Sequence, residues 1–228
     1  MELSPLLDAA KKGDLPQLKK FSEEDHDINE TAKNGLTALI LAAENNHKDV
    51  VDFLLDEGAD ANAATAMGGT AISRAAENGH VNIIRKLLDH GAKANDVALI
   101  AASREGELEV VKVLVENGAN VNAEQRWGVT PLMLAAREGH SDIVSYLLAN
   151  KAKIKVKDKD GHSALSLALD NDNAGIASQL RRAGAKADAV RKEQSDLDDE
   201  EDDVLDTDDF DDLIDEEEIP EDIDLDED

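Results

Sequence analysis

The sequence has no cysteine, very few aromatic residues and no long apolar run. The absence of cysteine excludes disulfides and a thiol nucleophile, and it is typical of an intracellular protein. Nowhere do about 18 apolar residues follow one another, so no membrane-spanning helix is predicted. The N-terminal stretch MELSPLLDAAKKGD lacks the basic flank and apolar core of a signal peptide. We therefore expect an intracellular protein, cytoplasmic or nuclear, that is not secreted and does not enter a membrane.

Positive charge is missing from one end of the chain. The segment from Glu193 to Asp228 holds 23 of the 52 acidic residues and no lysine or arginine. The rest of the chain holds 29 acidic and 24 basic residues, so it is close to balanced. A segment so rich in one charge buries too little apolar surface to offset the entropy that ordering costs. We therefore predict a disordered acidic tail over residues 191–228.

Motifs of catalytic chemistry are also missing. The sequence has neither the phosphate-binding pattern G-x-x-x-x-G-K-[ST] nor the nucleophile pattern G-x-S-x-G. Three of its six histidines, His47, His80 and His140, share one position of a repeated pattern, which indicates a repeated capping role. No close spacing of histidine and carboxylate residues is typical of a metal site. We predict no enzyme, no cofactor and no metal.

The sequence does contain one pattern repeated six times. It is clearest in TALILAAENNH, TAISRAAENGH and TPLMLAAREGH. The steps between copies are 33 residues, except for one of 27 between the third and the fourth. Regular recurrence of this length is typical of solenoids. The copies begin at Ser4, Thr37, Thr70, Val97, Thr130 and Ser163.

Each copy predicts a pair of helices. A short first helix opens at a serine or threonine and contains a small Ala-Ala pair. The second helix carries apolar residues at i, i+3 and i+4, as at Val50, Phe53 and Leu54. One such unit cannot bury its apolar face alone, whereas stacked units share a continuous core. Glycines then end the second helix, where a left-handed residue is needed, at Gly58, Gly91, Gly118 and Gly184.

This pattern resembles the ankyrin repeat, with its T-P-L-H-x-A-A and L-L-x-x-G-A-x-x-N motifs. The histidine of the first motif is absent, because Ile40, Ser73, Ile100, Met133 and Ser166 stand in its place. The resemblance implies an all-α repeat solenoid with short β-hairpin fingers, and a non-catalytic protein–protein interaction module. The repeats are placed at about 4–36, 37–69, 70–96, 97–129, 130–162 and 163–190, which makes a solenoid over residues 1–190.

In this family, partners usually touch the hairpin tips and the exposed face of the first helices. Trp127, the only tryptophan, is expected at a hairpin tip, where it either anchors a partner or packs on a neighbouring hairpin. Arg137 and its counterpart one repeat earlier, Arg104, are expected near it in space. The predicted partner-binding residues are Trp127, Arg126, Arg137, Arg104, Met67 and Val129.

The short step of 27 residues predicts a missing hairpin. Only six positions separate Gly91 from Val97, whereas twelve separate Gly58 from Thr70. The row of fingers should therefore have a gap between repeats three and four, unless the deletion is a harmless change in a surface loop. Repeat three also has Arg74 where neighbouring repeats have leucine, and the loss of a finger could let this side chain reach solvent or a carboxylate.

Lysine occupies every odd position of the stretch KAKIKVKDKD. On a strand these positions share one face. Lys151 stands where other repeats have glycine, so backbone strain is expected there, unless Asn150 takes the left-handed conformation instead. We call this row of lysines the lysine ladder. It either holds the acidic tail when no partner is bound or is an ordinary solvated hairpin edge. It consists of Lys151, Lys153, Lys155, Lys157 and Lys159.

Apolar residues are scattered through the acidic tail. Phe210, Leu213 and Ile214 fall at i, i+3 and i+4, so a short amphipathic helix could form on a partner. We expect the repeat face to bind one protein and the tail to bind or regulate a basic one, unless the tail only aids solubility. An alternative function is an inhibitor or chaperone of a histone-like nucleic-acid-binding protein, with the tail mimicking nucleic acid. Direct binding of nucleic acid is disfavoured, because the tail repels phosphates, and a monomer is expected.

Overall fold

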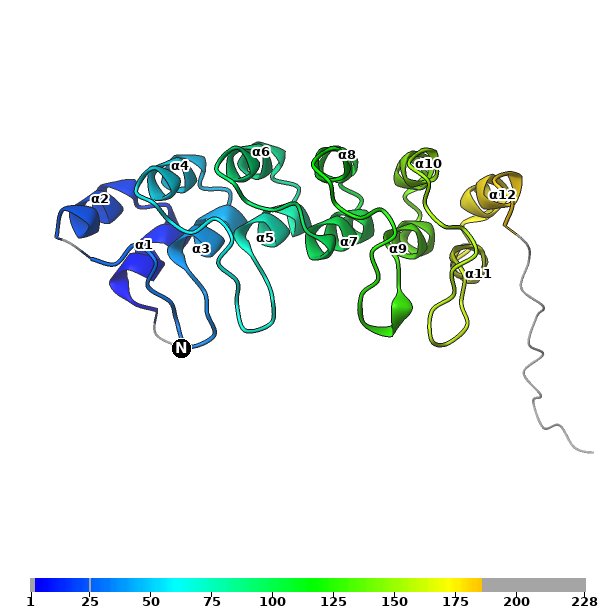
Figure 1. Ribbon diagram of the computed structural model, residues 1–228, viewed down its shortest axis with the longest axis horizontal. Coiled ribbons are helices and arrows are strands. Elements are labelled where there is room, and N and C mark those ends of the chain that lie inside the picture. The colour runs from blue at the N-terminus through cyan, green and yellow to red at the C-terminus, as the bar shows by residue number, and fades with distance from the viewer. Residues whose placement is uncertain (1–2, 25, 186–228) are drawn as a thin grey trace, which may run out of the picture. The chain divides into compact units, whose positions relative to one another are not determined.

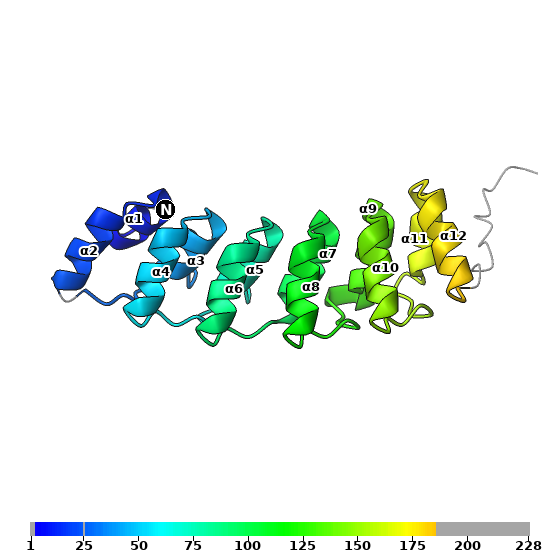
Figure 2. The ribbon, with the colours of Figure 1, turned by 90° about the horizontal axis from the view of Figure 1, so that it is seen from above.

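The computed structural model describes residues 3–24 and 26–185. The predicted tail, with Phe210, Leu213 and Ile214, lies outside the described residues. The described chain forms helix pairs stacked side by side, with an inner and an outer row (Figures 1 and 2). The predicted all-α solenoid of six repeats is confirmed. The inner row is α1 (Pro5–Lys12), α3 (Ala38–Glu44), α5 (Ala71–Glu77), α7 (Asp96–Glu105), α9 (Pro131–Glu138) and α11 (Ala164–Asp170). The outer row is α2 (Leu15–Glu23), α4 (Lys48–Asp56), α6 (Val81–Asp89), α8 (Leu108–Glu116), α10 (Ser141–Ala149) and α12 (Ala174–Arg182).

Side-chain caps start the inner helices. In five repeats a serine or threonine hydroxyl accepts the backbone N–H three residues further on, as predicted. The fourth repeat differs from its prediction, since α7 begins at Asp96 and the side chain of Asn95 caps it by accepting the N–H of Ala98. Val97, the predicted start of the repeat, lies inside the first turn of this helix. The five hydroxyl caps are Ser4, Thr37, Thr70, Thr130 and Ser163.

One continuous apolar core runs between the two rows. Neighbouring inner helices pack against each other along the row, and the Ala-Ala pairs at these contacts are buried. The outer helices contribute side chains such as Ile83 and Leu114, which are also fully buried. At the N-terminal end of the stack, α2 buries only Leu18. Such a stack is held by contacts between neighbouring repeats rather than by one global core.

Histidines link neighbouring repeats. His47, His80 and His140 precede α4, α6 and α10 but make no cap bond to these helices. Each Nε2 instead lies close to a backbone oxygen at the end of the preceding inner helix, where carbonyl groups lack helical partners. The expected capping role is thus confirmed, but the capped helix belongs to the preceding repeat. The distances are 2.9 Å from His47 to Lys11, 3.2 Å from His80 to Glu44 and 2.8 Å from His140 to Arg104.

Repeat four lacks this link, because Glu107 occupies the histidine position and a carboxylate cannot donate to a carbonyl oxygen. Its Oε2 lies over Gly79, where an added Cβ would be only 2.4 Å away, at the negative end of α5. Glu107→His is expected to raise the free energy of unfolding by about 1 kcal/mol, measured by urea denaturation. His140→Ala serves as the reverse variant and should lose about as much. A destabilised Glu107→His variant would contradict this account.

The backbone strain predicted at Lys151 is confirmed. Its φ is 66°, close to the 84° of Gly58 and the 92° of Gly118 at the equivalent position. A left-handed conformation costs a residue with a Cβ roughly 1–2 kcal/mol.

Lys151→Gly is therefore expected to stabilise the chain by about 1 kcal/mol, measured as a shift of the urea midpoint at constant slope. Lys153→Gly is the matched control. It removes the same charge two residues away, where the backbone is not left-handed. This variant should destabilise slightly, because glycine adds freedom to the unfolded chain. An equal response of the two variants would refute strain as the cause.

Candidate functional site

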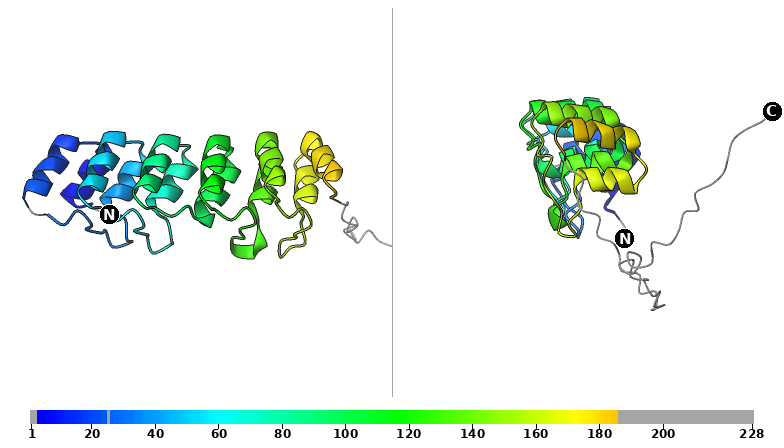
Figure 3. Two further views of the ribbon diagram at one scale, coloured as in Figure 1. Left: turned by 45° about the horizontal axis from the view of Figure 1, so that its top comes forward. Right: turned by 90° about the vertical axis from the view of Figure 1, so that its right-hand side faces the viewer.

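Four hairpin fingers project from one side of the stack (Figures 1 and 3). We call them the first finger (residues 31–36), the second finger (64–69), the third finger (124–129) and the fourth finger (157–162). No finger lies between α6 and α7, where the chain passes from one helix to the other within six residues. The predicted gap between repeats three and four is confirmed. We call this place, between the second and third fingers and below the start of α7, the finger gap.

Adjacent fingers are tied by one backbone hydrogen bond between equivalent positions. The N–H of Ala66 in the second finger donates to the Asn34 oxygen of the first, at 2.9 Å. The N–H of Lys159 in the fourth finger donates to the Trp127 oxygen of the third, at 2.8 Å. The described residues contain no such bond across the finger gap.

A second link between neighbouring repeats, a side-chain bridge that we call an asparagine brace, is also interrupted there. The side-chain amides of Asn62 and Asn122 each bond two backbone groups of the following repeat; Asn62, for example, donates to the Gly91 oxygen and accepts the N–H of Lys93, both at 2.9 Å. Asn95 stands at the corresponding place of repeat three but forms no brace, and Asp96 instead accepts the N–H of Asn120, at 3.3 Å. Because the hairpin is missing, Asn95 comes directly before α7 and caps it.

Trp127 lies at the tip of the third finger, in the 3-10 turn η1 (Arg126–Gly128), with 58% of its surface exposed. Its φ is 77°, at the third position of the turn that the N–H of Gly128 closes on the Gln125 oxygen at 3.0 Å. Glycine is strongly preferred at this position. The Lys159 ammonium lies 5.3 Å from the ring centroid. Trp127 therefore contacts the fourth finger yet keeps most of its surface free, in a strained conformation of a kind that clusters at binding sites.

The two arginines expected near Trp127 each pair with the glutamate that follows them in the chain. Arg104 pairs with Glu105 at 2.7 Å and Arg137 pairs with Glu138 at 2.8 Å, each at the end of its inner helix. Within the described residues, neither arginine makes a cation–π contact with the Trp127 ring. The cation at that ring is Lys159, which sequence reasoning had assigned only to the lysine ladder.

The other predicted residues fall in two environments. Met67, at the tip of the second finger, is 97% exposed, and Arg126 is exposed beside Trp127. Val129 is half-buried and packs in a small cluster with Ile100 and Leu134. Its place indicates that it supports the third finger from below.

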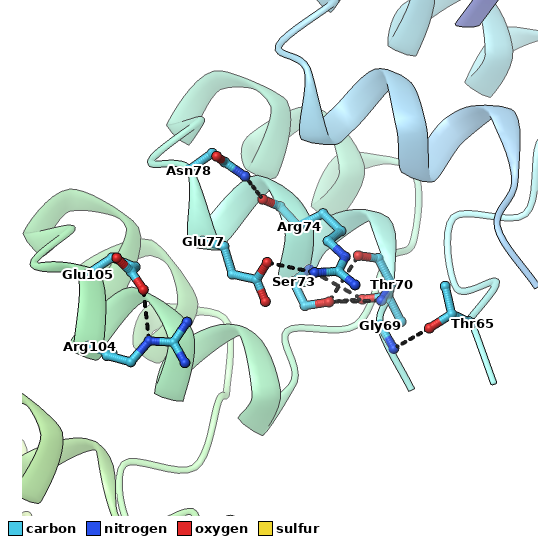
Figure 4. Close-up of polar contacts among 9 residues, drawn as sticks. All are labelled: Thr65, Gly69, Thr70, Ser73, Arg74, Glu77, Asn78, Arg104 and Glu105. Atoms are coloured by element: carbon cyan, nitrogen blue, oxygen red, sulfur yellow. Dashed lines mark hydrogen bonds and ion pairs between the residues drawn. The ribbon is translucent and has the colours of Figure 1, made fainter. Parts of the chain in front are cut away.

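Arg74 lies on α5 against the base of the second finger (Figure 4). One terminal nitrogen pairs with Glu77 at 2.9 Å, so the side chain reaches a carboxylate as expected. Its Nε is buried and has no hydrogen-bond partner among the described residues. A Cβ added to Gly69 would lie 3.4 Å from the guanidinium, so Gly69 leaves the space that Arg74 uses. Sequence reasoning singled out Arg74 but missed this glycine.

The comparison with protein families decides the identity of the fold. A model of ankyrin repeats matches residues 6–98 and 98–191. The chain belongs to the ankyrin repeat family. Ankyrin repeats are generic protein–protein interaction modules, and their fold is generally a non-catalytic scaffold. No curated protein matches this sequence.

Solved ankyrin-like structures superpose well on this chain. The human ASB11 ankyrin repeat domain is 28% identical with a TM-score of 0.74, covering 81% of this chain and 85% of that one. A second chain is 26% identical with a TM-score of 0.71, covering 80% of this chain and 99% of that one. It comes from a complex of the Bd0816 predatory endopeptidase of Bdellovibrio bacteriovorus with immunity protein Bd3460.

The lysine ladder runs into the last finger of the ankyrin stack. All five lysines are exposed, and the residues between them are buried or half-buried, so the predicted alternation is confirmed. Ile154 and Val156 line a groove of about 610 Å³ together with Ala183 and Gly184, and Lys153 and Lys155 flank it. The expected role of the ladder in holding the tail stays a prediction.

An unexpected group of metal-ligand type lies at the tip of the fourth ankyrin finger. Ligand atoms of Asp158, Asp160 and His162 all lie within 4.8 Å of one another. One Asp158 oxygen accepts the N–H groups of Asp160 and His162, at 3.0 and 2.8 Å, so the hairpin turn itself explains the grouping. Lys157 and Lys159 alternate with these residues and oppose a cation. The spacing D-x-D-x-H was the signal in the sequence that could have drawn attention to it.

Two side chains with a raised pKa lie on the outer row of the ankyrin stack. Partial burial, and then the negative charge of Glu116, raise the pKa of Tyr146 on α10. A hydrogen bond from Lys112 to Glu109 on α8 raises the pKa of the lysine.

Among the residues that the structure describes, no helix has the length and apolar character needed to cross a membrane.

Proposed function

We propose that this ankyrin chain is a non-catalytic intracellular protein-binding module whose fingers and inner helices hold one partner, while its acidic tail binds or regulates a basic one. The observation that carries the first half is the position of exposed apolar side chains. Met67, Val97 and Trp127 are each more than half exposed, and all three border the finger gap. Exposed apolar groups gathered in one place are typical of interaction surfaces.

The solved relatives support a binding role of this kind. Both share the ankyrin fold over four-fifths of this chain, and one of them is part of a complex of an enzyme with its immunity protein. The partner of the present chain is proposed only as a class, a protein. Trp127 is proposed as the central anchor, because buried tryptophans at interfaces frequently contribute 2 kcal/mol or more.

Trp127→Gly separates binding from stability. Loss of the left-handed strain offsets loss of the Lys159 contact, so the free energy of unfolding should change by less than about 1 kcal/mol. Recovery of the partner in a quantitative pull-down from the native host should fall at least about tenfold. Asn82→Ala on the outer face of α6 is the control and should leave recovery unchanged. Full recovery with Trp127→Gly would reject Trp127 as an anchor.

The second half of the proposal rests on charge. The segment from Glu193 to Asp228 concentrates 23 carboxylates without a single lysine or arginine. A polyanion of this kind attracts basic proteins over long range at low salt. The same feature favours the alternative function, an inhibitor or chaperone of a nucleic-acid-binding protein through mimicry of nucleic acid. Salt dependence separates the two halves, because binding through the tail should weaken strongly with ionic strength and binding to the fingers should not.

A further inference from the structure

The finger gap leaves one backbone acceptor and one backbone donor unused. Elsewhere the carbonyl of one finger tip bonds the N–H of the next, as Asn34 and Trp127 do. By the same register, the missing finger would bond the carbonyl of Met67 on one side and the N–H of Arg126 on the other. Within the described residues, neither group has a backbone partner. The two walls of the gap thus offer complementary groups to an inserted segment.

The width of the gap matches two strands. A finger has two arms joined by a turn, and among the described residues only isolated β-bridges, Ala64–Thr70 and Lys157–Ser163, pair such arms. At the spacing of paired strands, about 4.8 Å, a missing finger leaves about 10 Å. A hairpin turn from another protein would fit this width, and a single extended strand would fill only half of it. Added strands of this type are a recurrent mode of recognition, with backbone bonds giving affinity and side-chain contacts giving specificity.

Apolar side chains stand on all three sides of the gap. Met67 lies on the second finger, Trp127 on the third, and Val97 in the first turn of α7 between them. Val97 is 51% exposed, whereas Thr37 at the matching position of repeat two is buried. Among the described residues, Leu169 on α11 is the one further large apolar side chain that is exposed.

Arginines with unused N–H donors lie on the finger side of the stack. Arg126 is exposed and makes no ion pair among the described residues. Arg74 has a buried Nε without a partner, and Arg104 engages Glu105 through its Nε (Figure 4). A guanidinium presents five N–H donors and pairs well with a carboxylate. An incoming acidic side chain would therefore be bound by groups that are already in place.

We propose that the finger gap receives a hairpin loop of a partner protein that carries an apolar side chain next to an aspartate or glutamate. The loop bonds the Met67 carbonyl and the Arg126 N–H, as the missing finger would. Its apolar side chain packs among Met67, Val97 and Trp127, and its carboxylate pairs with Arg126. This inference rests on the proposed function and adds the place and the chemistry of the ligand.

A variant with a closed gap tests this directly. Copying residues 30–35 of the first finger after Asn95, with Asp96→Leu and Val97→Thr, restores a finger and its cap from the chain's own sequence. The probe is a disulfide-cyclised heptapeptide selected from a random phage-displayed library on the full chain. The protein has no cysteine that could exchange with the probe. Affinity is measured by fluorescence anisotropy.

The selected peptides should share an acidic residue beside an apolar one. Their affinity should fall at least about 30-fold in the closed-gap variant and about tenfold in Arg126→Ala, and stay unchanged in Lys33→Ala on the first finger. If the closed-gap variant does not fold, Val97→Glu replaces it, since Val97 is exposed and the new charge repels the ligand carboxylate.

Unchanged affinity in these gap variants, or no enriched peptide, overturns the proposal. Competition by a synthetic peptide of residues 204–216 would overturn it in favour of the chain's own tail. If Trp127→Gly abolishes partner recovery while the closed-gap variant keeps it, the proposed function stands and the gap assignment fails.

Discussion

Leu99→Ala is expected to lower the free energy of unfolding by about 3 kcal/mol and to split unfolding into two steps. Leu99 is fully buried on α7, which packs between α5 and α9. The link between repeats three and four lacks the finger bond and the histidine bridge. Of the asparagine brace it keeps only one counterpart, the bond from the Asn120 N–H to Asp96 at 3.3 Å. A defect in α7 should therefore let repeats four to six unfold while repeats one to three stay folded.

The single tryptophan makes this measurable. Trp127 lies in the C-terminal half, so its fluorescence reports that half, whereas far-ultraviolet circular dichroism reports all helices. In Leu99→Ala the fluorescence midpoint should come at a lower urea concentration than the circular dichroism midpoint. Leu39→Ala on α3 is the matched control, equally buried but in a repeat with its finger bond and asparagine brace intact. Coincident midpoints in Leu99→Ala would contradict a weak link at the gap.

Removal of the acidic tail is expected to have the second large effect. Ending the chain after Lys192 changes its formal net charge from −28 to −5. Binding of poly-lysine at low ionic strength, measured by isothermal titration calorimetry, should weaken at least about 100-fold, because the tail supplies most of the long-range attraction. In the full chain the same binding should collapse at high salt.

Charge and sequence within the tail can be separated. The triple variant Phe210→Ala, Leu213→Ala and Ile214→Ala keeps every carboxylate, so its affinity for poly-lysine should stay unchanged. If a natural basic partner binds through a short amphipathic helix, recovery of that partner should fall in the same variant. Undiminished poly-lysine binding by the truncated chain would refute an electrostatic role for the tail.

Features set by local rules were predictable from the sequence. The serine and threonine caps, the left-handed position of Lys151 and the missing finger each follow from a few neighbouring residues and the spacing of the repeats. The alternation of the lysine ladder is of the same kind, because neighbouring side chains on an extended segment point to opposite faces.

Features that depend on the register between repeats were not predictable. His47 occupies a cap position, but its acceptor is 36 residues away on the preceding inner helix. Asn95 changed its role because its neighbour in space, the finger, is absent. Arg104 and Arg137 each pair with the glutamate directly after them in the chain, a contact that the repeat pattern did not indicate.

Three residues around the finger gap depart from the usual rules of burial, backbone conformation and helix capping. Arg74 keeps a buried nitrogen without a partner, Trp127 adopts a conformation suited to glycine, and Val97 is exposed in a first turn where other repeats have a capping hydroxyl. Natural chains tend to break such rules at functional sites. This grouping, rather than any one of the residues, is the main reason to place the binding surface there.

Photo-crosslinking at single positions tests the central claim most directly. A photoreactive side chain replaces Met67, Trp127 or, as a control on the outer face, Asn82 in the full chain expressed in its native host. Our account predicts that positions 67 and 127 crosslink to the same protein, and that position 82 does not. Crosslinking of the partner from position 82 alone, or from neither finger, would contradict it.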